Sequence, residues 1–250
     1  INEDKAPIDI ESSGQRYIKP FTIEQALQAR KENPDALIIG GSTDMALLQT
    51  KKRVHLAKIL DLSGVDELNF IVEDHSRIAI GSGTSLEEIH QYTRENLPYL
   101  GEMLRVFGSL QIRNMATIGG NIGTASPIGD LLPVLIALRC EIRLMGVNKR
   151  RDLHIENFIT GYRKTDIEPD EIIAIIGLHK PKKNEIIKSY KIAKRVDLDI
   201  SSVSACLRLE LDNTGKVFQA IFAFGGVAAT PVRAKQTEEF LIGKPWSHNS

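Results

Sequence analysis

The sequence predicts an α+β fold with one small parallel unit and one larger, partly antiparallel unit. Over residues 36–62 an apolar strand, a glycine loop, a helix-like stretch and a second strand follow one another, which is the order of a βαβ unit. Over residues 185–225 three strand patterns follow one another across short polar turns, which is typical of an antiparallel sheet. Separate helical and strand-rich stretches of this kind favour α+β architecture.

The elements fall into four expected segments. Residues 1–16 are charged and Ser-rich and predict a linker. We expect a first subdomain over residues 17–75, a second over 76–182 and a sheet-rich C-terminal one, truncated, over 183–250. Helix ends are marked by capping boxes at Thr22 with Gln25 and at Ser85 with Glu88, by Asp130 before the apolar run 131–139, and by stops at Asn33–Pro34 and Gly243–Pro245.

The composition excludes several classes of function. The chain of 250 residues has 32 basic and 32 acidic residues, so no net field attracts nucleic acid or an anionic membrane. No stretch approaches 18 consecutive apolar residues, so no membrane span is expected. Its two cysteines and scattered histidines predict neither an iron–sulfur cluster nor a zinc site. We expect a reducing, cytoplasmic setting.

A first glycine segment, Ile38–Met45, reads IIGGSTDM and follows a predicted strand. Two glycines at a strand end let backbone N–H groups approach an anion, and Ser42 and Thr43 add hydroxyl donors. This chemistry suits a pyrophosphate. Taken alone, however, a glycine turn with a helix cap at Ser42 or Thr43 is the commoner explanation of such a segment.

A second glycine segment, residues 117–130, reads TIGGNIGTASPIGD and contains no Lys or Arg. We expect a long loop whose backbone must find hydrogen-bond partners, which a bound phosphate or flavin chain would supply. Asn121, Thr124 and Ser126 are donors, and Asp130 could accept from a sugar hydroxyl. The alternative is a turn-rich connection between subdomains; the ligand is slightly favoured, because functional sites concentrate in loops on rigid scaffolds.

Other motifs give weaker evidence of function. Gly81-Ser-Gly83 begins like a dinucleotide fingerprint but lacks the third glycine, so a strand end and helix cap is expected there. The chain has no phosphate-binding P-loop and no nucleophile elbow, and it offers no catalytic residue. By themselves, Arg113, Lys191 and Arg195 read as surface charges and Phe107 as a core residue.

Five segments in a fixed order carry a family resemblance over residues 17–244. They are GGSTDM, QIRNMATIGGNIGTASPIGDLLPVL, FITGYRKTDIEPDEII, KIAKRVDLDISSVSACLRL and FAFGGVAATPVRA. Together they resemble the FAD-binding domain of the molybdenum hydroxylases, which include xanthine dehydrogenases and the medium subunit of carbon monoxide dehydrogenase. The resemblance implies the FAD-binding fold of the vanillyl-alcohol-oxidase (PCMH) type, with FAD held noncovalently between the first two subdomains.

The resemblance also implies a role for particular residues. Residues 38–45 would wrap the pyrophosphate and ribityl chain, Asp130 would bind a sugar hydroxyl, Phe107 would contact the adenine end, and Lys191 would lie near the flavin ring. The full implied set is Ile38, Ile39, Gly40, Gly41, Ser42, Thr43, Asp44, Met45, Phe107, Ile112, Thr117, Gly119, Gly120, Asn121, Thr124, Asp130, Ile172, Ile173 and Lys191.

In the family's chemistry, electrons pass from a molybdenum cofactor across two [2Fe–2S] clusters to FAD, and then to NAD+ or dioxygen. The resemblance therefore implies an iron–sulfur domain or subunit and a molybdenum-cofactor subunit as partners, and no purine oxidation by this chain alone. Two alternatives stay open: a self-contained FAD-dependent reductase or oxidase, and a scaffold domain that has lost its flavin.

Overall fold

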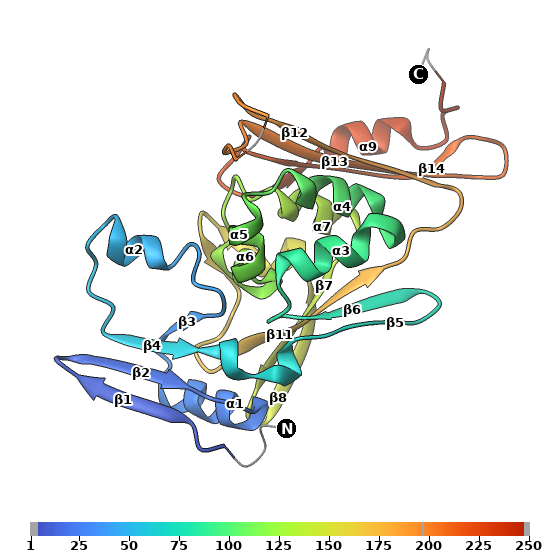
Figure 1. Ribbon diagram of the computed structural model, residues 1–250. Helices are drawn as coiled ribbons and strands as arrows, with labels where there is room; N and C mark the ends of the chain where they lie inside the picture. The colour runs from blue at the N-terminus through green and yellow to red at the C-terminus, as the bar shows by residue number, and fades with distance from the viewer. Residues whose placement is uncertain (1–4, 197, 248–250) are drawn as a thin grey trace.

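The computed structural model describes residues 5–196 and 198–247, and it shows three sheet-based regions in chain order (Figure 1). An N-terminal sheet lies at one end, a five-stranded sheet lies in the middle, and a C-terminal sheet lies on the far side of a layer of helices. The predicted α+β class is confirmed.

The N-terminal sheet contains the predicted parallel unit. Its strand order is β1-β2-β4-β3, with β4 parallel to both β2 and β3. Its elements are β1 (Ile8–Ser12), β2 (Gln15–Lys19), α1 (Ile23–Glu32), β3 (Leu37–Ile39), α2 (Ala46–Thr50) and β4 (Lys58–Asp61). We expected a linker over residues 1–16. This expectation is wrong for residues 8–16, because β1 and β2 form an antiparallel hairpin. Residues 1–4 lie outside the described part.

The middle sheet is antiparallel throughout, in the order β5-β6-β11-β7-β8. Its strands are β5 (Ile71–Glu73), β6 (Arg77–Gly81), β7 (Glu141–Gly146), β8 (Lys149–His154) and β11 (Ile172–His179). Because β5 pairs with β6, residues 71–73 belong to this region and not to the first subdomain, which was expected to extend to residue 75. Two short 3-10 helices, η1 (Leu62–Gly64) and η2 (Asp66–Leu68), connect the two sheets.

Helices form the layer between the middle and C-terminal sheets. They are α3 (Leu86–Asn96), α4 (Pro98–Arg105), α5 (Leu110–Met115), α6 (Ile118–Thr124), α7 (Leu131–Ala137) and α8 (Ile155–Phe158), followed by the short hairpin β9 (Ile159–Gly161) and β10 (Lys164–Thr165). Every residue of α7 is buried, because neighbouring elements cover it on all sides, including β13 and β14 of the C-terminal sheet. The apolar run that predicted this helix therefore forms the centre of the largest core cluster.

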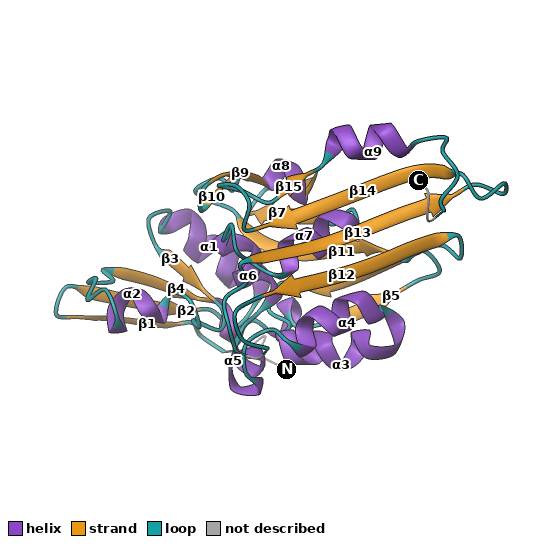
Figure 2. Ribbon diagram, turned by 90° about the horizontal axis from the view of Figure 1, so that it is seen from above, coloured by secondary structure: helices purple, strands orange, loops and turns teal. Residues whose placement is uncertain are grey.

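The C-terminal sheet confirms the predicted antiparallel strands, in the order β12-β13-β14-β15 (Figure 2). Its elements are β12 (Glu185–Ile192), β13 (Val203–Leu211), β14 (Val217–Gly225), β15 (Val232–Arg233) and α9 (Lys235–Leu241). Helix α9 lies along β14. Within the described residues, none of the helices is both long and apolar enough to cross a bilayer.

Candidate functional site

The two glycine segments are far apart in the sequence and touch in the structure. A Cβ atom built on Gly41 would lie 1.4 Å from the carbonyl oxygen of Met115, and one on Gly40 would lie 2.9 Å from Thr117 Oγ1. Such distances leave no room for a side chain, so glycine is required for this approach. The contact places the end of β3 directly against the start of α6 (Figure 1).

The first segment leaves hydrogen-bond donors available. Ser42 has a positive φ of 59°, which is uncommon for a residue other than glycine and often marks a functional loop. Within the described chain, the backbone N–H groups of Ser42 and Thr43 have no protein acceptor. The Asp44 carboxylate accepts a hydrogen bond of 3.1 Å from the Arg163 guanidinium. Arg163 lies in the GYRKT segment, and the sequence did not mark this residue as functional. The segment can therefore present two amides and two hydroxyls to an anion.

Residues 118–124 of the second segment form helix α6, so the long loop that was expected is limited to the turns of residues 125–130. Thr117 caps α6 by accepting from the Gly120 N–H at 3.1 Å. The Ile118 and Gly119 N–H groups donate to the carbonyls of Thr84 and Ser82, at 3.1 Å and 2.9 Å. The first turn of α6 thus needs no ligand for its backbone N–H groups, because neighbouring loop carbonyls and a cap supply their partners.

Helix α6 instead contributes two glycines that allow close packing and one buried polar atom without a hydrogen-bond partner. A Cβ on Gly119 would lie 2.6 Å from Ser82 Cβ, so this glycine lets the helix sit against the loop after β6. A Cβ on Gly123 would lie 3.5 Å from Ile173 Cδ1, which places Ile173 beside the same helix. The Asn121 Oδ1 atom is buried and has no hydrogen-bond partner. A ligand hydroxyl or N–H at that point would remove the cost of the unsatisfied group.

Asp130 and Lys191 form a buried ion pair with a separation of 2.7 Å, and each side chain is 8% exposed. Ser201 also donates to the Asp130 carboxylate, and Lys191 donates to the carbonyl of Val106 at 3.2 Å. Two expectations are corrected. Asp130 does not cap α7, since its side chain is engaged here, and Lys191 is not a surface charge. The pair joins the helical layer to β12, and long-range packing, which the sequence does not reveal, brings it together.

The remaining predicted residues take varied positions. Ile38 and Ile172 pack in one apolar cluster beneath the first glycine segment, and Ile39 pairs with Asp61 at the end of β3. Phe107 is half-buried and packs against the main core, as its residue type predicts, while Ile112 is 40% exposed on α5. Thr124 donates back to the Gly120 carbonyl at 2.9 Å within α6.

Arg113 is also not a surface charge. Its Nε atom lies 2.6 Å from Glu87 Oε2, and the side chains of Arg113 and Glu87 are only 11% and 8% exposed. His90 Nδ1 lies 3.6 Å from Glu87 Oε1 and has no hydrogen-bond partner. Burial tends to raise the pKa of Glu87, but the hydrogen bond and charge of Arg113 outweigh it and the pKa lies below its usual value. For His90, burial lowers the pKa despite the nearby Glu87.

The lowered pKa of His90 predicts a loss of stability in mild acid. Below a pH of about 6.5 the unfolded chain binds a proton at this residue more readily than the folded chain does, so the free energy of unfolding falls as the pH falls. We expect His90→Gln to reduce the slope of unfolding free energy between pH 7 and 5.5, by at most about 1.4 kcal/mol per pH unit. Urea titrations across this range measure the slope, with exposed His75→Gln as the control. Equal slopes in both variants would contradict the prediction.

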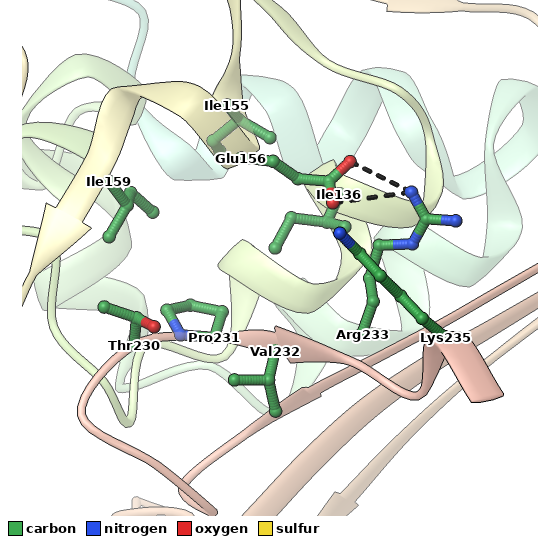
Figure 3. A pocket seen from close by; sticks show the side chains of 9 residues that line it. All are labelled: Ile136, Ile155, Glu156, Ile159, Thr230, Pro231, Val232, Arg233 and Lys235. Carbon is green, nitrogen blue, oxygen red and sulfur yellow. Dashed lines mark hydrogen bonds and ion pairs between the residues drawn. The ribbon is translucent and has the colours of Figure 1, made fainter. Parts of the chain in front are cut away.

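A separate groove of about 270 Å³ lies away from the glycine segments, between α8 and the start of α9 (Figure 3). Figure 3 shows Arg233 reaching across to Glu156, with their atoms 3.2 Å apart, and Arg233 also pairs with Glu238 at 2.6 Å. The Arg233–Glu156 contact connects the C-terminal region to α8 of the helical layer. The groove contains none of the predicted cofactor residues. Nor does any group of acidic, His or Cys side chains suited to a metal occur in the residues the structure describes.

Comparison with protein families decides the class of the site. Residues 11–180 match the family described as the FAD binding domain in molybdopterin dehydrogenase, and residues 188–250 match the CO dehydrogenase flavoprotein C-terminal domain. The chain belongs to the FAD-binding domains of the molybdopterin dehydrogenases. The expected family and its FAD cofactor are therefore confirmed.

Individual proteins agree with this assignment. The chain is 34% identical to xanthine dehydrogenase 1 of Arabidopsis thaliana over 94% of its length, and 29% identical to the xanthine dehydrogenase/oxidase of Gallus gallus over 98%. It spans only 18% and 19% of those two relatives. In fold it is similar to a chain of carbon monoxide dehydrogenase from Hydrogenophaga pseudoflava, with a TM-score of 0.87, 23% identity and coverage of 98% of this chain and 84% of that one.

The second fold comparison is with quinoline 2-oxidoreductase from Pseudomonas putida 86. Its TM-score is 0.83 at 22% identity, and the alignment covers 93% of this chain and 81% of that one. These likenesses confirm the expected fold, in which an FAD-binding domain is followed by a sheet-rich C-terminal part. For this FAD-binding family, the contact between the two glycine segments is the feature of the structure that best fits a dinucleotide.

Proposed function

We propose that this chain is the FAD-bearing electron-transfer domain of a xanthine dehydrogenase-like molybdenum hydroxylase. The observation that carries the proposal is the contact of Gly41 with the Met115 backbone and of Gly40 with the Thr117 side chain, beside backbone amides at Ser42 and Thr43 that have no acceptor in the described chain. The similarity to xanthine dehydrogenases over nearly the whole chain favours that branch of the family.

The donor set fits the cofactor. Ser42 and Thr43 would hold the diphosphate through N–H and hydroxyl groups, which suits an anion at a site with few cations. Asn121 Oδ1 would accept from a hydroxyl or N–H of the cofactor, and Ile173 would give apolar contact. In this proposal the flavin ring of bound FAD exchanges the electrons, and the chain's residues position it and exclude water.

Binding is proposed to be noncovalent. No Cys or His occurs in residues 38–45 or 117–130, and the pKa of both cysteine thiols is raised by burial, to about 12 for Cys206. Neutral, enclosed thiols are poor nucleophiles for attachment to a flavin.

We further propose that electrons arrive from [2Fe–2S] clusters on a partner domain or subunit, downstream of a molybdenum-cofactor subunit, and leave to NAD+ or dioxygen. The chain's small share of its xanthine dehydrogenase relatives supports such partners. We also propose a cytoplasmic location, and we expect no purine oxidation by this chain alone.

The visible spectrum of the purified chain tests the proposal. After incubation with excess FAD and desalting, we expect flavin absorbance to remain with the protein and to be released intact by acid. Absorbance that stays with the acid precipitate would contradict noncovalent binding. A folded chain without flavin absorbance would favour the flavin-free scaffold. Anaerobic bleaching by NADH would support NAD+ as the acceptor, and its absence would point to dioxygen or another oxidant.

A further inference from the structure

Residues 46–57 form an arm that begins where the first glycine segment ends. Its helix is α2, and no residue of α2 is buried. Figure 1 shows this helix apart from the helices of the central layer, on the connection between β3 and β4. Leu47 and Val54 of the arm are 44% and 43% exposed. The arm therefore contributes little to the core of this chain and keeps apolar side chains at the surface.

The arm is positively charged, and its cations have no partner in this chain. Lys51, Lys52 and Arg53 follow one another and are exposed, and residues 46–57 contain no Asp or Glu. Over the described residues, none of these three side chains forms an ion pair or a hydrogen bond. Arg53 has a φ of +53°, a left-handed conformation that favours glycine, so the turn after α2 retains a cation at a strained position.

Two other runs of basic residues, 149–151 and 180–183, find acidic partners within the chain. Their ion pairs include Lys149–Asp170, Arg151–Glu171, Lys180–Glu73 and Lys182–Glu210. On the arm, an acidic surface of another protein would supply the carboxylates that these runs find internally. The exposed apolar side chains of the arm would pack at the centre of such a contact, because interfaces combine an apolar core with a polar rim.

We propose that residues 46–57 are a docking surface for an acidic face of the polypeptide that holds the [2Fe–2S] clusters. This inference rests on the proposed function, in which such a partner gives electrons to FAD. Helix α2 has five residues and is about 7.5 Å long at 1.5 Å per residue, so only one short helix separates the cations from the amides of Ser42 and Thr43. A partner bound to the arm would lie beside the proposed FAD site, and charge attraction would guide it there.

Carbodiimide cross-linking of the whole protein, isolated with its partners, tests the docking directly. The reagent joins an amine to a carboxylate only where the two are in contact. We expect mass spectrometry to find Lys51 or Lys52 joined to Asp or Glu of the polypeptide segment that carries the cluster-binding cysteines. The internal control is the Lys149–Asp170 pair, whose atoms are 2.7 Å apart and which should be joined in every sample.

The reactivity of the lysines gives a second measurement on the same sample. Compared with residues 1–250 alone, Lys51 and Lys52 should react with an amine-specific label about tenfold more slowly in the assembly, because a covered amine reacts only when the interface opens locally. Lys183 and Lys235 are also exposed and serve as the comparison. Slowing of all four lysines to the same extent would show no preference for the arm and would overturn the inference.

Two further outcomes would overturn it. One is equal labelling of Lys51 and Lys52 in both samples. The other is cross-links that join the arm only to a second copy of this chain, which would assign the arm to a self-interface. An isolated protein without flavin absorbance, or without [2Fe–2S] clusters by iron analysis and electron paramagnetic resonance, would instead refute the proposed function.

Discussion

Gly41→Ala is expected to abolish retention of FAD and to lower the free energy of unfolding by about 3 kcal/mol or more. The new methyl group would lie 1.4 Å from the Met115 carbonyl oxygen, so backbone must move on one side of the contact. Overpacking against backbone costs about 1–3 kcal/mol and sometimes more, because no flexible side chain can give way. The displacement also separates the two glycine segments. Urea unfolding and flavin absorbance after desalting measure the two effects.

Gly177→Ala is the matched control for this substitution. Gly177 lies in β11, away from the glycine segments, and a Cβ there would be 3.7 Å from its nearest neighbour, which is ordinary contact. This variant should retain FAD and keep its unfolding free energy within about 1 kcal/mol. If Gly41→Ala bound FAD as tightly as this control, the contact of the glycine segments would not form the cofactor site.

Lys191→Met is expected to lower the free energy of unfolding of the FAD-free chain by about 3–5 kcal/mol. The substitution leaves the buried Asp130 carboxylate with the Ser201 hydroxyl but without its cation, and an uncompensated buried charge is costly. Adding Asp130→Asn should restore part of the loss, because the charge that lacks a partner is then removed. The double-mutant cycle should give a coupling energy of about 1–3 kcal/mol between the two residues.

An exposed pair of the same type supplies the comparison. Lys58 lies 2.9 Å from Asp35, whose side chain is 68% exposed, so Lys58→Met should cost less than about 1 kcal/mol. Denaturant titrations of the four variants and the parent chain provide all the values. A cost for Lys191→Met as small as that for Lys58→Met would show that Asp130 and Lys191 do not hold the helical layer to β12.

Local signals were sufficient for much of the fold. The capping box at Ser85 and Glu88 forms as predicted, because a helix cap depends on residues within one turn of each other. The strands of 185–225 pair in sequence order, because short turns leave few alternatives for neighbouring strands. Gly40 and Gly41 stay predicted cofactor residues, and the structure adds that Thr117 and Met115 lie against them.

The sequence analysis did not predict the hairpin of residues 8–19 or helix α6, and the two omissions have a related cause. In the hairpin, β1 is exposed along its whole length, and β2 owes its place to pairing with β4, which comes about 40 residues later. The second contains glycines that disfavour a helix by about 1 kcal/mol each, yet the Thr117 cap and the carbonyls of Ser82 and Thr84 hold its first turn. In both, tertiary contacts outweigh local propensity.

The sequence by itself determined the α+β class, the antiparallel C-terminal strands and the two glycine segments, since each depends on neighbours along the chain or on residue type alone. Only the tertiary structure decided which charges are buried. Arg113 and Lys191 look like ordinary surface residues in the sequence, and their partners Glu87 and Asp130 lie 26 and 61 positions away. Burial of a charge depends on what packs around it in space, and that information is distributed over the whole chain.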